Sequence, residues 1–232
     1  LYPPMNLQLT QQDNSVELNW ETPLNQGKDF QEYRIYKNEE LYETISNIDQ
    51  LSFTDENVEN GFYYEYYITA FYSGTPSGES PASNIVSVVM GLNEIYSWDF
   101  EDGTQGWTIL DSYLGWRWGV PVNISGNSSE YLSIDSDDAG SSYHVFDYAI
   151  SPELDLSAFN YALIDFEYGY RNYSSDFLKL MYRVSPTSSW VEIENLGESA
   201  SFTDQSVELP SEALTENTQI SFYYDDNNVW AW

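Results

Sequence analysis

Apolar and polar residues alternate in short runs along the first ninety residues of the chain. The clearest run is 64–70, where Tyr64, Tyr66, Ile68 and Ala70 fall on one face. A period of two is typical of a β-strand with one buried face. Further strand-like runs, separated by polar turns, include residues 5–9, 16–20, 33–37, 41–45 and 83–90. Helical spacing is absent, so residues 1–90 are predicted to form a small antiparallel β-sandwich.

Several motifs in these runs resemble those of a fibronectin type III domain. They are Pro3-Pro4 before the first strand, Trp20 followed by Pro23, Tyr33-x-Ile35-Tyr36, Tyr64 six residues before Ala70, and Ser77-Gly-Glu-Ser80 entering the last strand. The resemblance implies that Trp20 is the core tryptophan. It also implies that Tyr64 is the tyrosine-corner residue, whose hydroxyl ties down a loop.

Alternation resumes after a short joint at residues 90–93, and the strands become longer. The runs include 131–134, 149–156, 162–170, 177–184, 190–193, 207–209 and 219–224. We therefore predict an all-β chain of two β-sandwiches, divided near residues 91–93, with no helix beyond short turns. The predicted domains are residues 1–90 and 94–232.

The second half is similar to the jelly-roll module of cleaved adhesins, which is MAM-like and of the choice-of-anchor J type. The matching residues are Trp98-Asp-Phe100-Glu101 with Gly106-Trp107, Ile150-Ser-Pro152-x-Leu154-Asp-Leu156, Leu163-Ile-Asp-Phe166-x-Tyr168, Leu178-Lys-Leu180 before Trp190, and Phe222-Tyr-Tyr224-Asp-Asp226. Such modules occur in large bacterial surface and secreted proteins. The resemblance implies a jelly-roll β-sandwich that is larger than the first domain.

The sequence departs from this second family at its end. Members usually continue past an aromatic pair like Trp230-Ala-Trp232 into a closing strand, and this chain stops first. The domain is therefore predicted to lack its last strand. Residues 219–224 would then form an open edge that could exchange a strand with a neighbouring chain.

Composition narrows the partners that the chain could have. Asp and Glu total 38 against 7 Lys and Arg, a formal net charge of −31, which would repel nucleic acid and anionic lipid surfaces. Cysteine is absent, which removes disulfides and thiol chemistry. No apolar stretch is long enough to cross a bilayer. We therefore expect a protein that binds no nucleic acid and inserts into no membrane. The resemblance to the cleaved-adhesin module implies a secreted or bacterial cell-surface protein.

Two acidic loops at strand ends suggest one oxygen-rich cation site. The first lies in the stretch 97–108. The second, which we call the acidic knot, is residues 135–140, about thirty residues further on. Calcium takes six to eight hard oxygen ligands, which carboxylates supply. The predicted calcium ligands are Asp99, Glu101, Asp135, Asp137 and Asp138. A pair of solvated acidic turns with no ion is the alternative.

Catalytic residues are not evident in the pattern. His144 is the single histidine, and no Gly-x-Ser-x-Gly elbow accompanies it. We therefore interpret His144 as a surface or structural residue and the chain as a non-enzyme. A zinc site of ordinary composition would want further histidines or cysteines.

The aromatic residues offer a second kind of site. Trp116, Trp118 and Tyr113 cluster near the loop end of the second domain, where aromatic rings could stack on sugar rings. Tryptophans of a β-sandwich are often core residues, and Trp116 is the exposed one of the two if Trp118 faces inward. The predicted ligand-binding residues are Trp116, as the exposed tryptophan, and Tyr113.

These observations favour a non-catalytic extracellular binding or adhesion fragment of a larger protein. Its expected partner is a glycan or a cell-surface or matrix protein, and calcium is its expected cofactor. The alternative is a structural or targeting segment of an exported multidomain protein, for example a secreted protease, with no ligand of its own.

Overall fold

The computed structural model describes residues 1–24, 29–122, 124, 126, 129–140, 142–172 and 175–227. The chain folds as two compact units, Leu1–Asn93 and Glu94–Trp232. In the described residues the helices are one short turn each, α1 (Ser136–Ala139) and the 3-10 turn η1 (Ser211–Ala213). The prediction of an all-β chain with helix only in short turns is confirmed.

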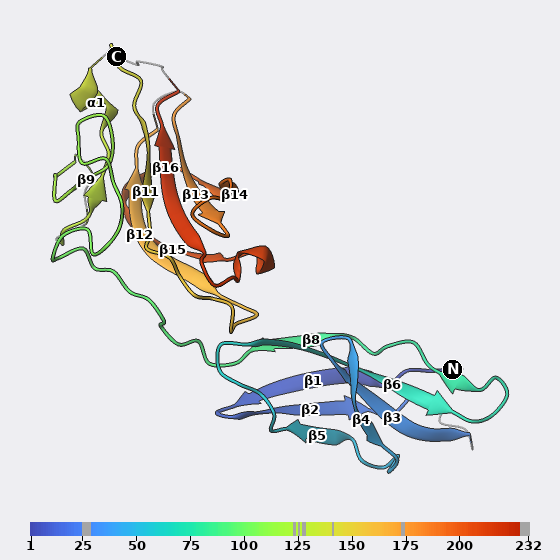
Figure 1. The fold of residues 1–232 in the computed structure, drawn as a ribbon. Helices are drawn as coiled ribbons and strands as arrows, with labels where there is room; N and C mark the ends of the chain where they lie inside the picture. The colour runs from blue at the N-terminus through green and yellow to red at the C-terminus, as the bar shows by residue number, and fades with distance from the viewer. Residues whose placement is uncertain are drawn as a thin grey trace. The chain divides into compact units, whose positions relative to one another are not determined.

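The strands of the first unit form two sheets (Figure 1). One sheet has the order β1-β2-β5, with β1 (Met5–Gln12), β2 (Ser15–Glu21) and β5 (Ser52–Asp55). The other has the order β4-β3-β6-β7, and β8 also pairs with β6; its strands are β3 (Phe30–Lys37), β4 (Glu40–Ile45), β6 (Tyr63–Tyr72), β7 (Gly78–Glu79) and β8 (Val86–Val89). Every pairing is antiparallel.

The core of the first unit comes from the alternating faces that the sequence displays. Tyr66, Ile68 and Ala70 of β6 are fully buried. Trp20 is also buried, and its ring meets that of Tyr33 edge to face, with centroids 5.3 Å apart. The role of Trp20 as the core tryptophan is confirmed.

Tyr64 is the tyrosine-corner residue that the sequence indicates. Its side chain is buried, and its hydroxyl accepts a hydrogen bond of 2.9 Å from the backbone N–H of Glu59. The bond closes the loop that precedes β6, so the expected role of Tyr64 is confirmed.

Tyr64→Phe should lower the free energy of unfolding of the first unit by about 1 kcal/mol, because it removes this hydrogen bond and keeps the ring. Tyr67→Phe is the matched control, since Tyr67 lies on the opposite face of β6 and stacks on Tyr36 through its ring. Urea unfolding of the full chain measures both variants. Equal effects of the two substitutions would contradict the assigned role.

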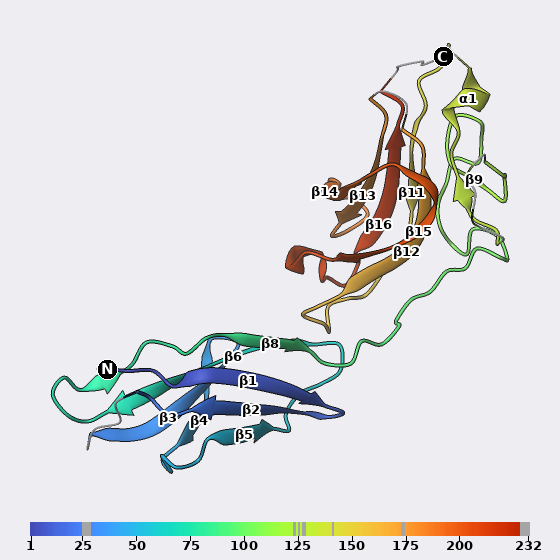
Figure 2. The same ribbon diagram turned by 180° about the vertical axis from the view of Figure 1, so that it is seen from behind.

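The second unit holds one four-stranded sheet, which has the order β11-β16-β13-β14. Its strands are β11 (Phe146–Ile150), β13 (Phe177–Arg183), β14 (Val191–Leu196) and β16 (Gln219–Asp225). The strands β12 (Leu163–Tyr170) and β15 (Ser199–Glu208) pair with each other, as do β9 (Arg117–Trp118) and β10 (Leu132–Ser133). The segment that carries β9 and α1 lies beside β11 in both views (Figure 1 and Figure 2).

The β12–β15 pair packs on one face of the four-stranded sheet. Phe166 of β12 meets Phe222 of β16 edge to face, with ring centroids 5.0 Å apart. Leu180, Tyr182 and Ile220 are buried in the same hydrophobic cluster as Val207 of β15. The described part of the second unit is therefore built from sheets that face each other across an apolar core.

The predicted open edge at residues 219–224 is wrong. Strand β16 lies inside its sheet and pairs with β11 on one side and with β13 on the other. The edges of the sheet are β11 and β14. Strand exchange at β16 therefore has no free edge to use, and the aromatic pair Trp230 and Trp232 lies outside the described residues.

Candidate metal centre

The acidic residues of the first loop, Asp99 and Glu101, accept hydrogen bonds from the protein itself. The Asp99 carboxylate accepts the backbone N–H of Glu101 at 3.1 Å and the side-chain amide of Gln105 at 2.5 Å. The hydrogen bond from Gln105 holds the pKa of Asp99 below its usual range. The Glu101 carboxylate accepts the backbone N–H of Glu130 at 3.2 Å. Both carboxylates therefore act as turn and loop acceptors.

The acidic knot forms the N-terminus of the short helix α1. Asp135 is the N-cap of α1, and its carboxylate accepts the backbone N–H of Asp137 at 3.0 Å. Asp137 and Asp138 lie in the first turn, where carboxylates are favourable because the helix N-terminus is partly positive. Asp138 also forms an ion pair with Arg117, with a nitrogen–oxygen distance of 2.8 Å.

The predicted calcium ligands do not converge. Among the described residues, no three of Asp99, Glu101, Asp135, Asp137 and Asp138 place their ligand oxygens within 4.8 Å of one another. Four of these carboxylates instead have protein partners: the Glu101 N–H and Gln105 amide for Asp99, the Glu130 N–H for Glu101, the Asp137 N–H for Asp135 and Arg117 for Asp138. Calcium at these residues stays a prediction that the geometry does not support.

The exposure expected of the two tryptophans is reversed. Trp116 is only 8% exposed, and its indole N–H donates to the backbone carbonyl of Asp147 at 3.2 Å. Trp118 is 37% exposed. The prediction that Trp116 is the exposed ring is wrong, because the Asp147 carboxylate also binds the Trp116 backbone N–H at 3.0 Å and draws this residue against β11.

Tyr113 lies at the surface, as a ligand-binding residue must. Its side chain is 49% exposed, and its ring meets that of the half-exposed Tyr143 edge to face, with centroids 6.1 Å apart.

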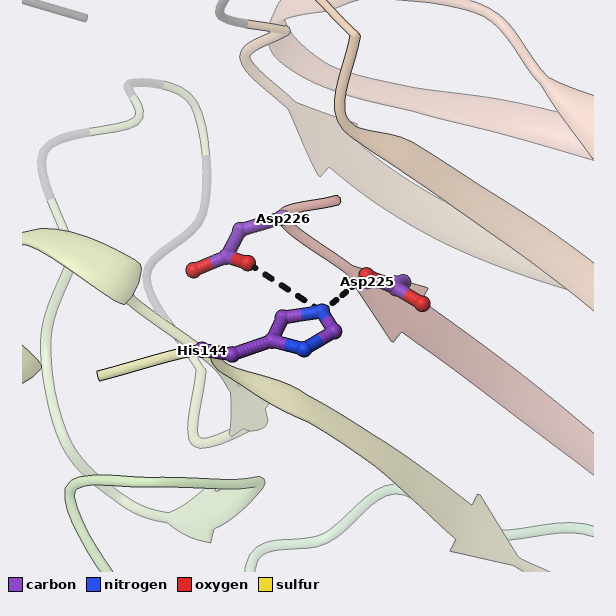
Figure 3. A group of neighbouring side chains, drawn as sticks. All are labelled: His144, Asp225 and Asp226. Atoms are coloured by element: carbon purple, nitrogen blue, oxygen red, sulfur yellow. Dashed lines mark hydrogen bonds and ion pairs between the residues drawn. The ribbon is translucent and has the colours of Figure 1, made fainter. Parts of the chain in front are cut away.

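A different cluster gathers at the end of β16. The Nε2 atom of His144 lies 2.7 Å from Oδ1 of Asp225 and 3.5 Å from Oδ1 of Asp226 (Figure 3). The three ligand atoms lie within 4.8 Å of one another, and they form the one such group of three in the described part of the chain. The side chains of Asp226 and His144 are 6% and 39% exposed.

The pairing of β11 with β16 builds this cluster. Phe146 is opposite Asp225 in the register, which brings His144 to the end of β16. The backbone N–H of Asp226 donates to the carbonyl of Val145 at 3.0 Å, and the Asp226 carboxylate accepts the Val145 N–H at 3.0 Å. Val145 and Asp226 are thus joined by a backbone and a side-chain hydrogen bond next to the His144 imidazole.

The cluster contains two carboxylates and only one imidazole, so its negative and positive charges do not balance. Burial raises the pKa of Asp225, but hydrogen bonds from His144, Tyr223 and the Asn227 N–H outweigh it and hold the pKa below its usual range. A protonated imidazole compensates only one of the two carboxylates. Two like charges about 4 Å apart repel by roughly 4 kcal/mol at an effective dielectric constant near 20. The interpretation of His144 as a surface or structural residue omitted these two partners.

Comparison with known proteins identifies the first unit. Residues 2–86 match the family model of the fibronectin type III domain, so the first unit is a fibronectin type III domain. Such domains are typically extracellular or surface modules that bind or space other parts, and they are generally non-catalytic. The comparisons do not confirm the cleaved-adhesin resemblance of the second unit, and no curated protein matches the chain.

Solved structures resemble the chain over about two fifths of its length. The sixth fibronectin type III domain of human fibronectin type III domain containing protein 3 is 22% identical, with 41% of this chain and 92% of that chain covered and a TM-score of 0.33. The family 28 exopolygalacturonase of Yersinia enterocolitica is 16% identical, with 39% and 20% covered and a TM-score of 0.33. The chain thus spans about a fifth of that enzyme. In the described residues, no helix is long and apolar enough to cross a membrane.

Proposed function

We propose that this chain is a non-catalytic binding or adhesion fragment of a larger secreted or cell-surface protein of bacterial origin. The observation that carries the proposal is the fibronectin type III domain at residues 2–86, because such domains are often extracellular binding or structural modules. The charge of −31 fits a partner that is neither nucleic acid nor an anionic membrane.

The second unit is proposed to be the jelly-roll module that its motifs resemble. Its four-stranded sheet and the β12–β15 pair face each other across an apolar core, as a sandwich requires. This support concerns architecture alone.

A glycan is the partner that the exposed aromatics favour. Tyr113 and Tyr143 are both half-exposed and in ring contact, and they stand on the segments on either side of β9 and α1. Aromatic rings present an apolar face together with a polar hydroxyl, which suits the CH groups and hydroxyls of a sugar. Because acidic side chains dominate the chain, we propose a neutral glycan rather than an anionic one.

Tyr113→Ala should abolish or weaken glycan binding by at least about tenfold, the equivalent of 1.4 kcal/mol or more of stacking contact. Screening the full chain on a glycan array, then titrating the best neutral glycan by calorimetry, measures this. Tyr2→Ala is the matched control, since Tyr2 is a half-exposed tyrosine of the first unit. Equal loss in both variants, or undiminished binding by Tyr113→Ala, would overturn the assignment.

The second candidate is a structural or targeting segment without a ligand. A fibronectin type III domain favours this reading as well, because such domains also serve as structural modules. Absence of binding on both a glycan array and a panel of matrix proteins, by a chain that unfolds cooperatively, would select it.

A further inference from the structure

We propose that His144, Asp225 and Asp226 bind one divalent transition-metal ion of the zinc class. The inference is independent of the glycan partner. It rests on a mixed donor set, one imidazole nitrogen and two carboxylate oxygens, which the ends of two paired strands bring together (Figure 3). The three donors supply the number of protein ligands that a zinc site with one open position uses.

The spacing of the donors suits such an ion. Zinc–nitrogen and zinc–oxygen bonds of about 2.0–2.2 Å at tetrahedral angles place neighbouring ligand atoms roughly 3.3–3.5 Å apart. The distance from His144 Nε2 to Asp226 Oδ1 is 3.5 Å, at the upper end of that range, and the distance to Asp225 Oδ1 is 2.7 Å, below it. Small shifts of the Asp225 and His144 side chains would therefore seat the ion.

Hydrogen bonds hold the two carboxylates in place. Oδ2 of Asp225 accepts the Tyr223 hydroxyl at 2.8 Å, and Oδ1 of Asp225 accepts the Asn227 N–H at 2.7 Å. Oδ2 of Asp226 accepts the Val145 N–H at 3.0 Å, and Oδ1 of Asp226 lies 3.5 Å from His144 Nε2. Such outer contacts orient metal ligands and are part of a metal site.

Burial and charge favour a bound cation whose charge is greater than +1. The Asp226 side chain is more than nine-tenths buried, and a buried carboxylate needs compensation. A divalent ion bound to neutral imidazole balances both carboxylates, which a protonated imidazole does not. His144 is partly exposed, so that solvent can reach the one open position of the ion.

The imidazole selects the class of metal. Calcium and magnesium prefer all-oxygen ligand sets, whereas imidazole suits zinc, copper, nickel and iron. The cluster is therefore expected to bind zinc ahead of calcium, and ahead of manganese, which prefers oxygen ligands and stands lower in the usual order of affinities.

The chain has a single histidine, which makes the test direct. Zinc chloride is titrated into the chelator-treated full chain while the imidazole nitrogens are followed by nitrogen-15 NMR. We expect one zinc per chain, a shift of the His144 Nε2 resonance, and a higher melting temperature in zinc. Calcium at the same concentration should leave the Nε2 resonance unchanged.

Two substitutions separate binding from folding. His144→Ala and Asp226→Asn should each weaken zinc binding by at least about tenfold, and Asp226→Asn keeps an oxygen for the Val145 N–H. Asp204→Ala, in β15 and outside the cluster, should bind as the unsubstituted chain does. An unmoved Nε2 resonance, or equal zinc affinity in all three variants, would overturn the proposal, because zinc would then occupy other surface carboxylates or none.

Discussion

Asp55→Ala is expected to lower the free energy of unfolding of the fibronectin type III domain by about 3–5 kcal/mol, the cost of leaving a buried charged group without its partner. The Asp55 side chain is fully buried. It accepts hydrogen bonds of 2.7–2.8 Å from Lys37 Nζ, the hydroxyls of Tyr42 and Tyr66, and the backbone N–H of Asn57. Removing the carboxylate deprives all four donors of their acceptor.

The same network gives the domain a dependence on pH. Burial raises the pKa of Asp55, but the hydrogen bonds from Lys37, Tyr42 and Tyr66 outweigh it, so that the pKa lies below its ordinary value. A carboxyl group whose pKa is lowered by folding contributes stability above its unfolded pKa, near 4. That contribution should be lost as the pH falls through the lower, folded pKa.

Hydrogen exchange during urea unfolding of the full chain reports separately on residues 1–93 and on the second unit, and so measures the effect of Asp55→Ala. Glu40→Ala is the control, because Glu40 is an exposed acidic residue at the start of β4. The control should change stability by less than about 0.5 kcal/mol. A loss below about 1 kcal/mol for Asp55→Ala, or a loss that does not decrease as the pH is lowered below the unfolded pKa near 4, would contradict the role of the network.

Leu180→Ala should have the largest effect on the second unit, a destabilisation of about 2–5 kcal/mol. Leu180 is fully buried in the middle of β13 and packs in the cluster that joins the four-stranded sheet to β15. Truncation removes its apolar contacts and leaves a cavity between the two sheets. The first unit should keep its stability, because it has a hydrophobic core of its own.

Lys179→Ala provides the comparison for Leu180. It is the adjacent residue and points to the opposite face of β13, where it forms a partly exposed ion pair with Glu192. Its loss should amount to about 1 kcal/mol or less. The same urea and hydrogen-exchange experiment reads both variants. Equal loss from the two, or a matching loss in residues 1–93, would show that the second core is not organised as described.

The first domain was predictable because its signals are local. A single strand such as β6 shows its buried face in its own alternation, and Trp20 and Tyr64 sit at fixed places relative to their strands. Local patterning also predicts β12, β13 and β16 of the second unit, but it finds only the end of β15, at residues 207–209. It does not determine their order in a sheet, because β16 returns from the end of the described chain to a place between β11 and β13.

The sites were harder to predict, for two physical reasons. A short acidic run supplies oxygens equally well to a cation and to the N–H groups of a helix start, and Asp135 does the second. His144 and Asp225 are 81 residues apart, so that their contact depends on the register of β11 with β16. The Asp225-Asp226 pair next to an apolar strand end was the one local signal.

The burial of Trp116 illustrates the limit of alternation in loops. Period two would place Trp116 and Trp118 on the same side of a strand, but Trp116 is 8% exposed and Trp118 is 37% exposed, so alternation does not say which of the two is buried. The Asp147 carboxylate, which binds the backbone of Trp116, decides this from a distant strand.

Binding without turnover is the central claim, and one incubation tests it most directly. The full chain is mixed with insoluble polysaccharides that carry the glycan selected on the array. The protein retained on the pellet and the soluble sugars released are then measured together. The account predicts retained protein, reduced retention of Tyr113→Ala, and no sugar released above the level of a protein-free control. Soluble products that accumulate with time in proportion to the protein added would contradict it.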